Sequence, residues 1–139
     1  MWDAINNSML LVKDNGFYYI SIYNKTRTSN YWLKIKKIYN KAPNMLKKLM
    51  EYIYFSIYYF LLPLTWNKNP FKYIRTYQKN RGMYPIIDVI DWLGGYPYEF
   101  ATFDEITDFI KKIEPKFSLI KYRKVKLNMN NHFLFKKNL

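Results

Sequence analysis

A short run of aromatic and β-branched residues near the beginning of the chain, FYYISIY at Phe17–Tyr23, constrains the fold most strongly. It follows the turn-forming residues Asp14-Asn15-Gly16, and this combination predicts a strand. Because nearly all of its residues are apolar or aromatic, we interpret it as a fully buried strand with neighbours on both sides. Other segments with strand character occur only at the far end of the 139-residue chain. The pattern therefore predicts an α/β fold whose sheet joins distant segments and is incomplete.

Helical periodicity marks the segments on either side of this strand. Residues 1–13 place four apolar side chains on one helical face, namely Trp2, Ile5, Met9 and Val12. The periodicity is helical again from Tyr31 to about Leu64, with a break at Pro43. We expect the second of these helices to run from Asn44 to about Leu62 and to end at Pro63.

The middle of the chain gives weaker local signals. Trp66–Arg81 is basic and aromatic, and the glycines and prolines of Gly82–Ala101 indicate irregular structure around a short helix. Thr102 and Glu105 have the spacing of a capping box, so a helix is expected to begin there and to end before Pro115.

Two strands are predicted at the end of the chain, over Phe117–Leu127 and His132–Phe135. The Asn-rich residues 128–131 join them, so we expect a hairpin. The full order is therefore helix, strand, helical insertion, helix and terminal antiparallel hairpin.

The distribution of charged residues indicates which kinds of partner the chain could bind. The formal net charge is +13, but 19 of the 23 basic residues are Lys and four are Arg, which favours a compositional bias over selected phosphate contacts. Seven of the ten acidic residues fall within Asp88–Glu114, whereas Lys25–Arg81 contains only Glu51. An anionic membrane surface is therefore an alternative partner, and nucleic acid a less favoured one. The chain has no Cys and one His, His132, which excludes disulfides and thiolate or histidine-cluster metal sites.

The block Arg81–Ala101, which contains DWLGGYPYEFA, resembles a subgroup of class I S-adenosylmethionine-dependent methyltransferases found beside sugar- and polysaccharide-modifying genes. Met1–Lys25 is similar to the stretch that forms a helix, a turn and a strand ending in YN in that family. Asn131–Phe135, NHFLF, resembles its closing strand NEFVF. The chain differs from the subgroup at two positions. Ile87 stands where the subgroup has a His, and His132 stands where the closing strand of the family has a Glu.

The resemblance implies the C-terminal half of a Rossmann-like methyltransferase, with methyl transfer from S-adenosylmethionine to a small acceptor such as a sugar. It implies three parts: the end of the core in 1–25, a helical cap with an acceptor-side loop in 26–101, and the final helix and hairpin in 102–139. The family binds the donor at a Gly-rich turn after its first strand, and the chain lacks this turn because its only glycine pair is Gly94-Gly95.

We therefore expect a cytoplasmic chain that is inactive alone. Either the donor-binding half is a separate N-terminal polypeptide, or the gene is truncated, or its start is wrongly assigned. The rival function is non-enzymatic, a basic accessory protein that binds anionic membrane or nucleic acid.

Seven residues are candidates for acceptor binding: Tyr23, Asn24, Arg81, Asp88, Asp91, Tyr96 and Glu99. Tyr23 and Asn24 end the first predicted strand, where open α/β sheets bind ligands, although Asn at a strand end is equally ordinary. Tyr96 could stack on the acceptor and Glu99 could accept its hydrogen bonds, with packing in a tight turn as the equal alternative. For Trp92 and Pro97, packing is favoured.

The other three candidates carry charge. Asp88 and Asp91 could share a helix face and bind an acceptor hydroxyl or act as a general base, although a solvated face is favoured. Arg81 could hold an anionic group bidentately, and a surface ion pair is the equal alternative.

Overall fold

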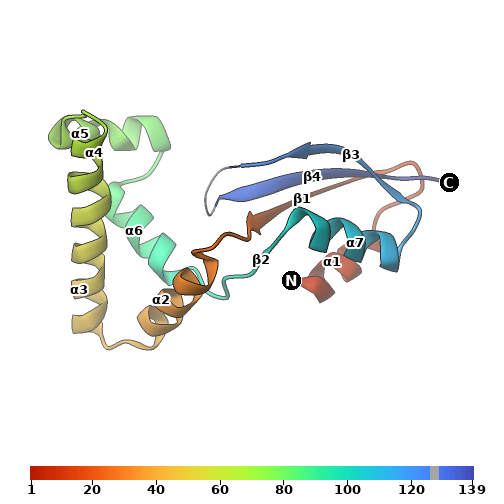
Figure 1. The fold of residues 1–139 in the computed structure, drawn as a ribbon, viewed down its shortest axis with the longest axis horizontal. Helices are drawn as coiled ribbons and strands as arrows, with labels where there is room; N and C mark the ends of the chain where they lie inside the picture. Colours follow the sequence, from red (N-terminus) through yellow and green to blue (C-terminus); the bar gives the residue numbers. More distant parts are fainter. Residues whose placement is uncertain (126–128) are drawn as a thin grey trace. The chain divides into compact units, whose positions relative to one another are not determined.

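The computed structural model describes residues 1–125 and 129–139 and divides the chain into two compact units (Figure 1). The sheet unit comprises Met1–Asn30 and Glu99–Leu139, and the helical unit comprises Tyr31–Tyr98. The fold is mixed α/β, with one open four-stranded mixed sheet in the sheet unit.

The sheet has the strand order β2-β1-β4-β3. Its strands are β1 (Phe17–Asn24), β2 (Phe100–Ala101), β3 (Phe117–Arg123) and β4 (Asn130–Lys137). β1 is parallel to β2 and antiparallel to β4, and β3 and β4 form the expected antiparallel hairpin. The last strand of the chain therefore lies between the first strand and its own hairpin partner.

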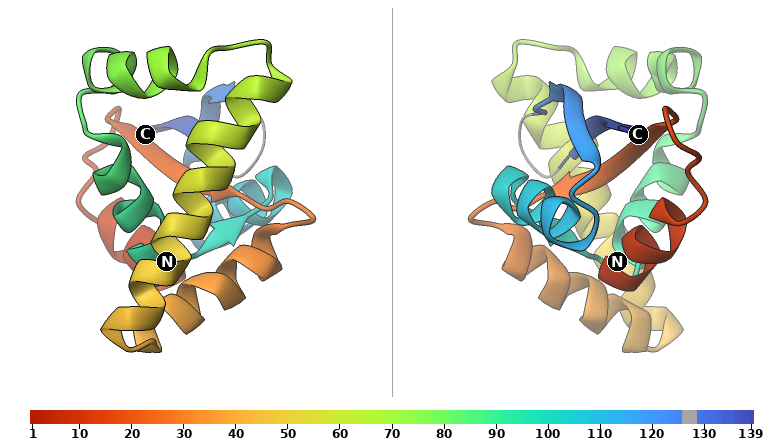
Figure 2. Two further views of the ribbon diagram at one scale, coloured as in Figure 1. Left: turned by 90° about the vertical axis from the view of Figure 1, so that its left-hand side faces the viewer. Right: turned by 90° about the vertical axis from the view of Figure 1, so that its right-hand side faces the viewer.

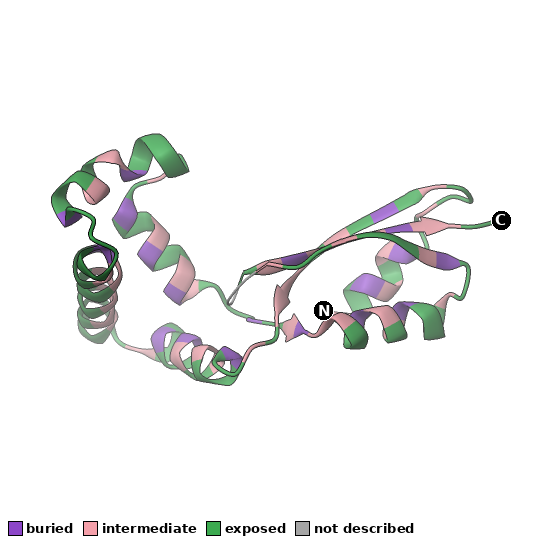
Figure 3. Ribbon diagram, turned by 45° about the horizontal axis from the view of Figure 1, so that its top comes forward, coloured by how far each residue is buried: buried purple, intermediate pink, exposed green. Residues whose placement is uncertain are grey.

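The prediction that β1 is fully buried is wrong. Tyr18 is 7% exposed, but Phe17 and Tyr19 are 64% and 60% exposed, so burial alternates along the strand (Figure 3). The helices α1 (Trp2–Met9) and α7 (Phe103–Ile113) lie on the same side of the sheet (Figure 1). Only one face of β1 is therefore packed, as is common in sheets with antiparallel pairs.

In the core of the sheet unit, the apolar faces of α1 and α7 pack against one face of the sheet. Its buried residues are Ile5, Met9, Tyr18, Ala101, Ile106, Ile110, Phe117, Phe133 and Phe135. The helical face predicted in residues 1–13 is confirmed, because Ile5 and Met9 are buried and Trp2 and Val12 pack against this core.

The ends of these elements follow the local signals only in part. α1 ends at Met9, and the turn before β1 contains Asn15 in the left-handed region (φ 60°). The capping box of α7 is confirmed, with reciprocal hydrogen bonds between Thr102 and Glu105. The strand predicted to reach Leu127 ends at Arg123, and its positions 126 and 127, like position 128 of the predicted connection, lie outside the described residues.

The helical unit contains most of the helical segments. They are α2 (Ser29–Lys41), α3 (Asn44–Phe55), the π-helix η1 (Ser56–Leu61), α4 (Leu62–Thr65), α5 (Pro70–Arg81) and α6 (Pro85–Gly94). Figure 2 shows α3, η1 and α4 as one continuous helix. In the described parts of the chain, none of the helices combines the length and the apolar character needed to cross a bilayer.

The prediction that the second helix ends at Pro63 is wrong, because helical structure continues to Thr65. Pro63 stands in the first turn of α4, where the missing N–H of proline is tolerated. The helix α5 was not predicted, although its signals are present. Asn69 caps it by accepting a hydrogen bond from Lys72 N at 3.1 Å, and Gly82 ends it at a φ of 78°.

Tyrosines dominate the core of the helical unit. Its buried residues are Tyr39, Tyr59, Tyr77, Val89 and Leu93. Tyr59 stacks on Phe55 and meets Tyr77 edge-on, with ring centroids 5.1 and 4.9 Å apart. These rings bury large apolar areas but also bring hydroxyl groups into the core, and each of these needs a hydrogen-bond partner.

Candidate functional site

The carboxyl ends of β1 and β2 lie side by side. Tyr23 is paired with Phe100 and Asn24 with Ala101, and Lys25 N donates to Ala101 O at 3.1 Å just beyond the strands. In open α/β sheets, ligands bind outside the carboxyl ends of parallel strands, because the loops that leave these strands converge there. This edge is therefore the candidate site that the geometry favours.

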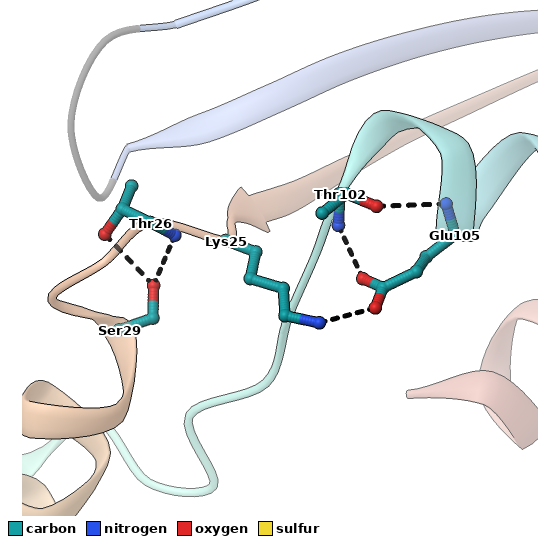
Figure 4. A network of polar contacts seen from close by, with 5 residues as sticks. All are labelled: Lys25, Thr26, Ser29, Thr102 and Glu105. Carbon is teal, nitrogen blue, oxygen red and sulfur yellow. Dashed lines mark hydrogen bonds and ion pairs between the residues drawn. The ribbon is translucent and has the colours of Figure 1, made fainter.

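A network of polar side chains follows the two strands (Figure 4). Lys25 Nζ lies 2.5 Å from Glu105 Oε1, and Glu105 Oε2 accepts from Thr102 N at 2.8 Å. The ammonium group of Lys25, followed by the backbone N–H of Thr102, lowers the pKa of the Glu105 carboxyl. Glu105 therefore stays ionised at neutral pH and holds Lys25 beside the carboxyl end of β1.

A second set of contacts fixes the chain that leaves β1. Thr26 N donates to Ser29 Oγ at 2.8 Å, and Ser29 is 1% exposed (Figure 4). Asn131, also 1% exposed, donates from Nδ2 to Asn24 Oδ1 at 3.1 Å and accepts from Val125 N at 3.1 Å. These bonds give the end of β1 a defined geometry and keep its buried polar atoms satisfied.

We call this group the carboxyl-end cluster, and it consists of Asn24, Lys25, Thr26, Ser29, Thr102, Glu105 and Asn131. It offers hydroxyl, amide, carboxylate and ammonium groups within one small region, and groups of these kinds can hydrogen-bond to a hydroxylated molecule. Within residues 1–125 and 129–139, no group of three or more His, Cys, Asp or Glu side chains is placed so that it could hold a metal ion.

The seven predicted site residues fall into two groups. Tyr23, Asn24 and Glu99 belong to the sheet unit, and the other four belong to the helical unit. Glu99 lies next to β2 and accepts from the Met1 amino group at 2.9 Å. In the helical unit, Tyr96 is 48% exposed and precedes Pro97 through a cis peptide bond.

Asp88 and Arg81 are brought together in the helical unit. Asp88 Oδ2 accepts from Tyr59 OH at 3.0 Å and from Tyr77 OH, and lies 3.9 Å from an Arg81 guanidinium nitrogen. Burial and the hydrogen bond to Asp88 raise the pKa of Tyr77. The carboxylate of Asp88 thus accepts hydrogen bonds from the hydroxyls of two core tyrosines. This structural role could not be predicted from the sequence around Asp88.

Asp91 lies near the most unusual charged group of the helical unit, Lys36, which is 1% exposed. Lys36 Nζ donates to the Trp92 carbonyl and lies 4.1 Å from the centroid of the Trp92 ring and 5.2 Å from that of Tyr98. Burial lowers its pKa to about 8, against the opposing influence of Asp91. Gly95 lies beside this amine, and a Cβ there would be 3.4 Å from Lys36 Nζ and 3.1 Å from Asp91 O.

Sequence reasoning missed Lys36 and most of the carboxyl-end cluster. Lys36 stands in the run KIKK, which is typical of a solvated helix face. Lys25 and Glu105 are 80 positions apart, so only the capping-box spacing of Glu105 marked one of the two. Ile87, at the position where the subgroup carries His, is 51% exposed, and His132 Nδ1 pairs with Tyr19 OH at 2.6 Å.

Comparison of the chain with protein-family models, with curated proteins and with solved structures finds no match.

Proposed function

We propose that this chain is the C-terminal part of an S-adenosylmethionine-dependent methyltransferase that acts on a small hydroxylated acceptor such as a sugar. The observation that carries the proposal is the order of elements in the sheet unit: helix α1, strand β1, helix α7 and the antiparallel pair β3–β4. This is the order that the sequence resemblance implies for the second half of a Rossmann-like methyltransferase.

The sheet also supports the proposal by being open along β1. β2 pairs only with Tyr23 and Asn24 on one side of β1. In the described part of the chain, no other strand pairs with 17–22 on that side. Unpaired strand edges invite a further strand, and a nucleotide-binding half would supply one.

The chain's glycines do not fit a donor site. Gly16 precedes β1, Gly82 ends α5, and Gly94 and Gly95 close α6, so none of them opens a helix directly after a strand. The methyl donor would therefore be held by another half. In this proposal the carboxyl-end cluster orients the acceptor, and positioning is a large part of what any such site contributes to rate.

The first test is to read the coding DNA upstream of Met1 in all three frames. A strand followed by a Gly-rich turn, about 80–120 residues upstream, is expected from the size of a nucleotide-binding half. The joined halves should then transfer labelled methyl groups from S-adenosylmethionine to a sugar-containing acceptor pool, whereas the present chain alone should not.

Two results would overturn the proposal. Methylation by the present chain alone would show that the donor is bound by residues other than those expected. Absence of any nucleotide-binding half upstream, together with inactivity of this chain, would remove the basis for assigning methyl transfer.

A further inference from the structure

The long helix formed by α3, η1 and α4 exposes a continuous row of large apolar side chains. We call this row the apolar stripe, and it consists of Met45, Leu49, Tyr52, Ile53, Ile57, Phe60, Leu61 and Leu64. Each of these side chains is between 39% and 86% exposed. Single exposed apolar residues are ordinary, but a contiguous row of this kind marks an interaction surface.

The π-helix η1 keeps this row on one side. Four-residue steps such as Leu49, Ile53, Ile57 and Leu61 exceed the roughly 3.6 residues of an α-helical turn, so in a regular helix the row would drift around the axis. The wider π turn over Ser56–Leu61 compensates for this drift, because its hydrogen bonds span one more residue. The last members of the apolar stripe therefore stay in line with the first.

The opposite side of the same helix forms the interior of the helical unit. Tyr59 is 1% exposed, Pro63 is buried, and Tyr54 and Phe55 pack against the tyrosine core. The only carboxylate of the segment, Glu51, accepts from Tyr39 OH at 2.6 Å on this inner side. The apolar stripe itself thus contains no charged residue.

Cations flank both ends of the apolar stripe. Lys41 and Lys48 are exposed near its beginning, and Lys68, Lys72 and Arg75 are exposed near its end. Phe71 meets Phe60 of the stripe edge-on, with ring centroids 5.7 Å apart. A hollow of about 510 Å³ beside Phe71 is lined by Lys72 and Arg75, so positive charge adjoins the apolar surface directly.

The net charge of the helical unit decides which partner fits. It has eleven Lys and Arg against three Asp and Glu, and the sheet unit has twelve against seven. A second copy would therefore meet like charge. Nucleic acid would be expected to use stacking aromatics, whereas the stripe is mainly aliphatic. An amphipathic helix with an apolar face and flanking Lys and Arg suits an anionic lipid surface.

We infer that the helical unit docks on an anionic membrane surface, with the apolar stripe inserted at the headgroup boundary and the flanking cations on lipid phosphates. The docking inference is independent of the proposed methyl transfer, because it depends only on residues of α3, η1, α4 and the beginning of α5. The helix lies in the plane of the interface rather than across the bilayer, as its single apolar side requires.

Vesicle sedimentation of the full chain tests the inference. The wild type should bind phosphatidylcholine vesicles that contain phosphatidylglycerol, and should bind pure phosphatidylcholine far more weakly. Raising the salt to about 0.5 M should weaken the binding, because exposed charges are then screened. A triple variant of the apolar stripe, Leu49→Gln, Ile53→Gln and Leu61→Gln, should lose at least about tenfold in partition coefficient.

A matched control carries the same substitution at exposed apolar positions of the sheet unit. Leu10→Gln, Leu11→Gln and Ile120→Gln change residues that are 76%, 86% and 54% exposed, and the partition coefficient should change by less than about twofold. Circular dichroism should show both triple variants folded, because all six positions are exposed.

Four results would overturn the inference. The first is absence of binding to anionic vesicles at low salt, and the second is equal binding to anionic and neutral vesicles. The third is an equal loss of partition coefficient in the stripe variant and the control. The fourth is a dimer in solution that the stripe variant abolishes, while the wild type does not bind vesicles. An oligonucleotide bound equally well by the wild type and the stripe variant, without vesicle binding, would assign the cations to nucleic acid instead.

Discussion

The cores of the sheet unit and the helical unit are built from different side chains. Apart from Tyr18, the residues of the buried core cluster of the sheet unit are aliphatic, methionine or phenylalanine, whereas three of the five residues in the buried core cluster of the helical unit are tyrosines. Each of these tyrosines donates its hydroxyl to a carboxylate, Asp88 or Glu51. The sheet unit is therefore held by packing, and the helical unit also depends on partly buried charges, which makes it sensitive to charge removal and to pH.

The largest expected effect is the loss of packing in the sheet unit. Phe133 is 1% exposed and stacks among Phe103, Tyr122 and Phe135. Phe133→Ala should lower the free energy of unfolding by about 3–5 kcal/mol, because it leaves a cavity in a dense core. Hydrogen exchange measured by mass spectrometry should accelerate in peptides of the sheet unit and stay nearly unchanged in 31–98.

The exposed Ile120 serves as the control, and Ile120→Ala should cost less than about 1 kcal/mol. Equal acceleration of exchange in both units after Phe133→Ala would show that the two cores unfold as one, which contradicts the expectation that each unit has a core of its own.

Removal of a carboxylate should give the next largest effect, in the helical unit. Asp88→Ala leaves the hydroxyls of Tyr59 and Tyr77 without their acceptor and should lower the free energy of unfolding by about 2–3 kcal/mol. Urea denaturation followed by tyrosine circular dichroism measures this change. Asp108→Ala, at an exposed position of α7, is the matched control and should change stability by less than about 0.5 kcal/mol. Similar losses in the two variants would refute the structural role of Asp88.

The pH dependence of stability should also separate the two units. Burial lowers the pKa of Lys36 from 10.5 to about 8, so the protonated amine is disfavoured in the folded state. Stability is therefore lower below pH 8 and rises as the pH increases from 8 toward 10.5, by about 1–2 kcal/mol. Above pH 10 an opposing contribution begins, because the pKa of Tyr39 is raised from 10.0 to about 12 and only the unfolded chain releases that proton easily.

Thermal unfolding between pH 7.5 and 10 checks this prediction. The rise in stability should disappear in Lys36→Met and persist in Lys37→Met, since Lys37 is exposed on the same helix. A rise that survives Lys36→Met would assign the pH dependence to another group.

The sequence predicted local features better than long-range ones. The strand β1, the terminal hairpin and the cap of α7 were all predicted from short-range signals. For the cap, that signal was the three-residue spacing of Thr102 and Glu105. The one-sided burial of β1 did not, because it depends on which face the helices cover. The burial of Lys36 and the pairing of Lys25 with Glu105 join side chains far apart in the sequence, and residue patterns do not carry that information. The acceptor-binding roles of the seven candidate residues stay predictions.

The smallest expected effect concerns the capping box, which joins the stability of α7 to the carboxyl-end cluster. Thr102→Ala removes the hydroxyl that accepts from Glu105 N at 3.1 Å and should lower the free energy of unfolding by about 1 kcal/mol. Thr107→Ala, on the same helix, removes a hydroxyl that bonds back to the carbonyls of Phe103 and Asp104 in the preceding turn, so stability should stay constant or rise slightly because Ala is the better helix former. Urea denaturation of the two variants measures the difference. If both lost the same amount, the cap would add nothing specific, and the geometry of Glu105 and Lys25 would have to be set by the sheet alone.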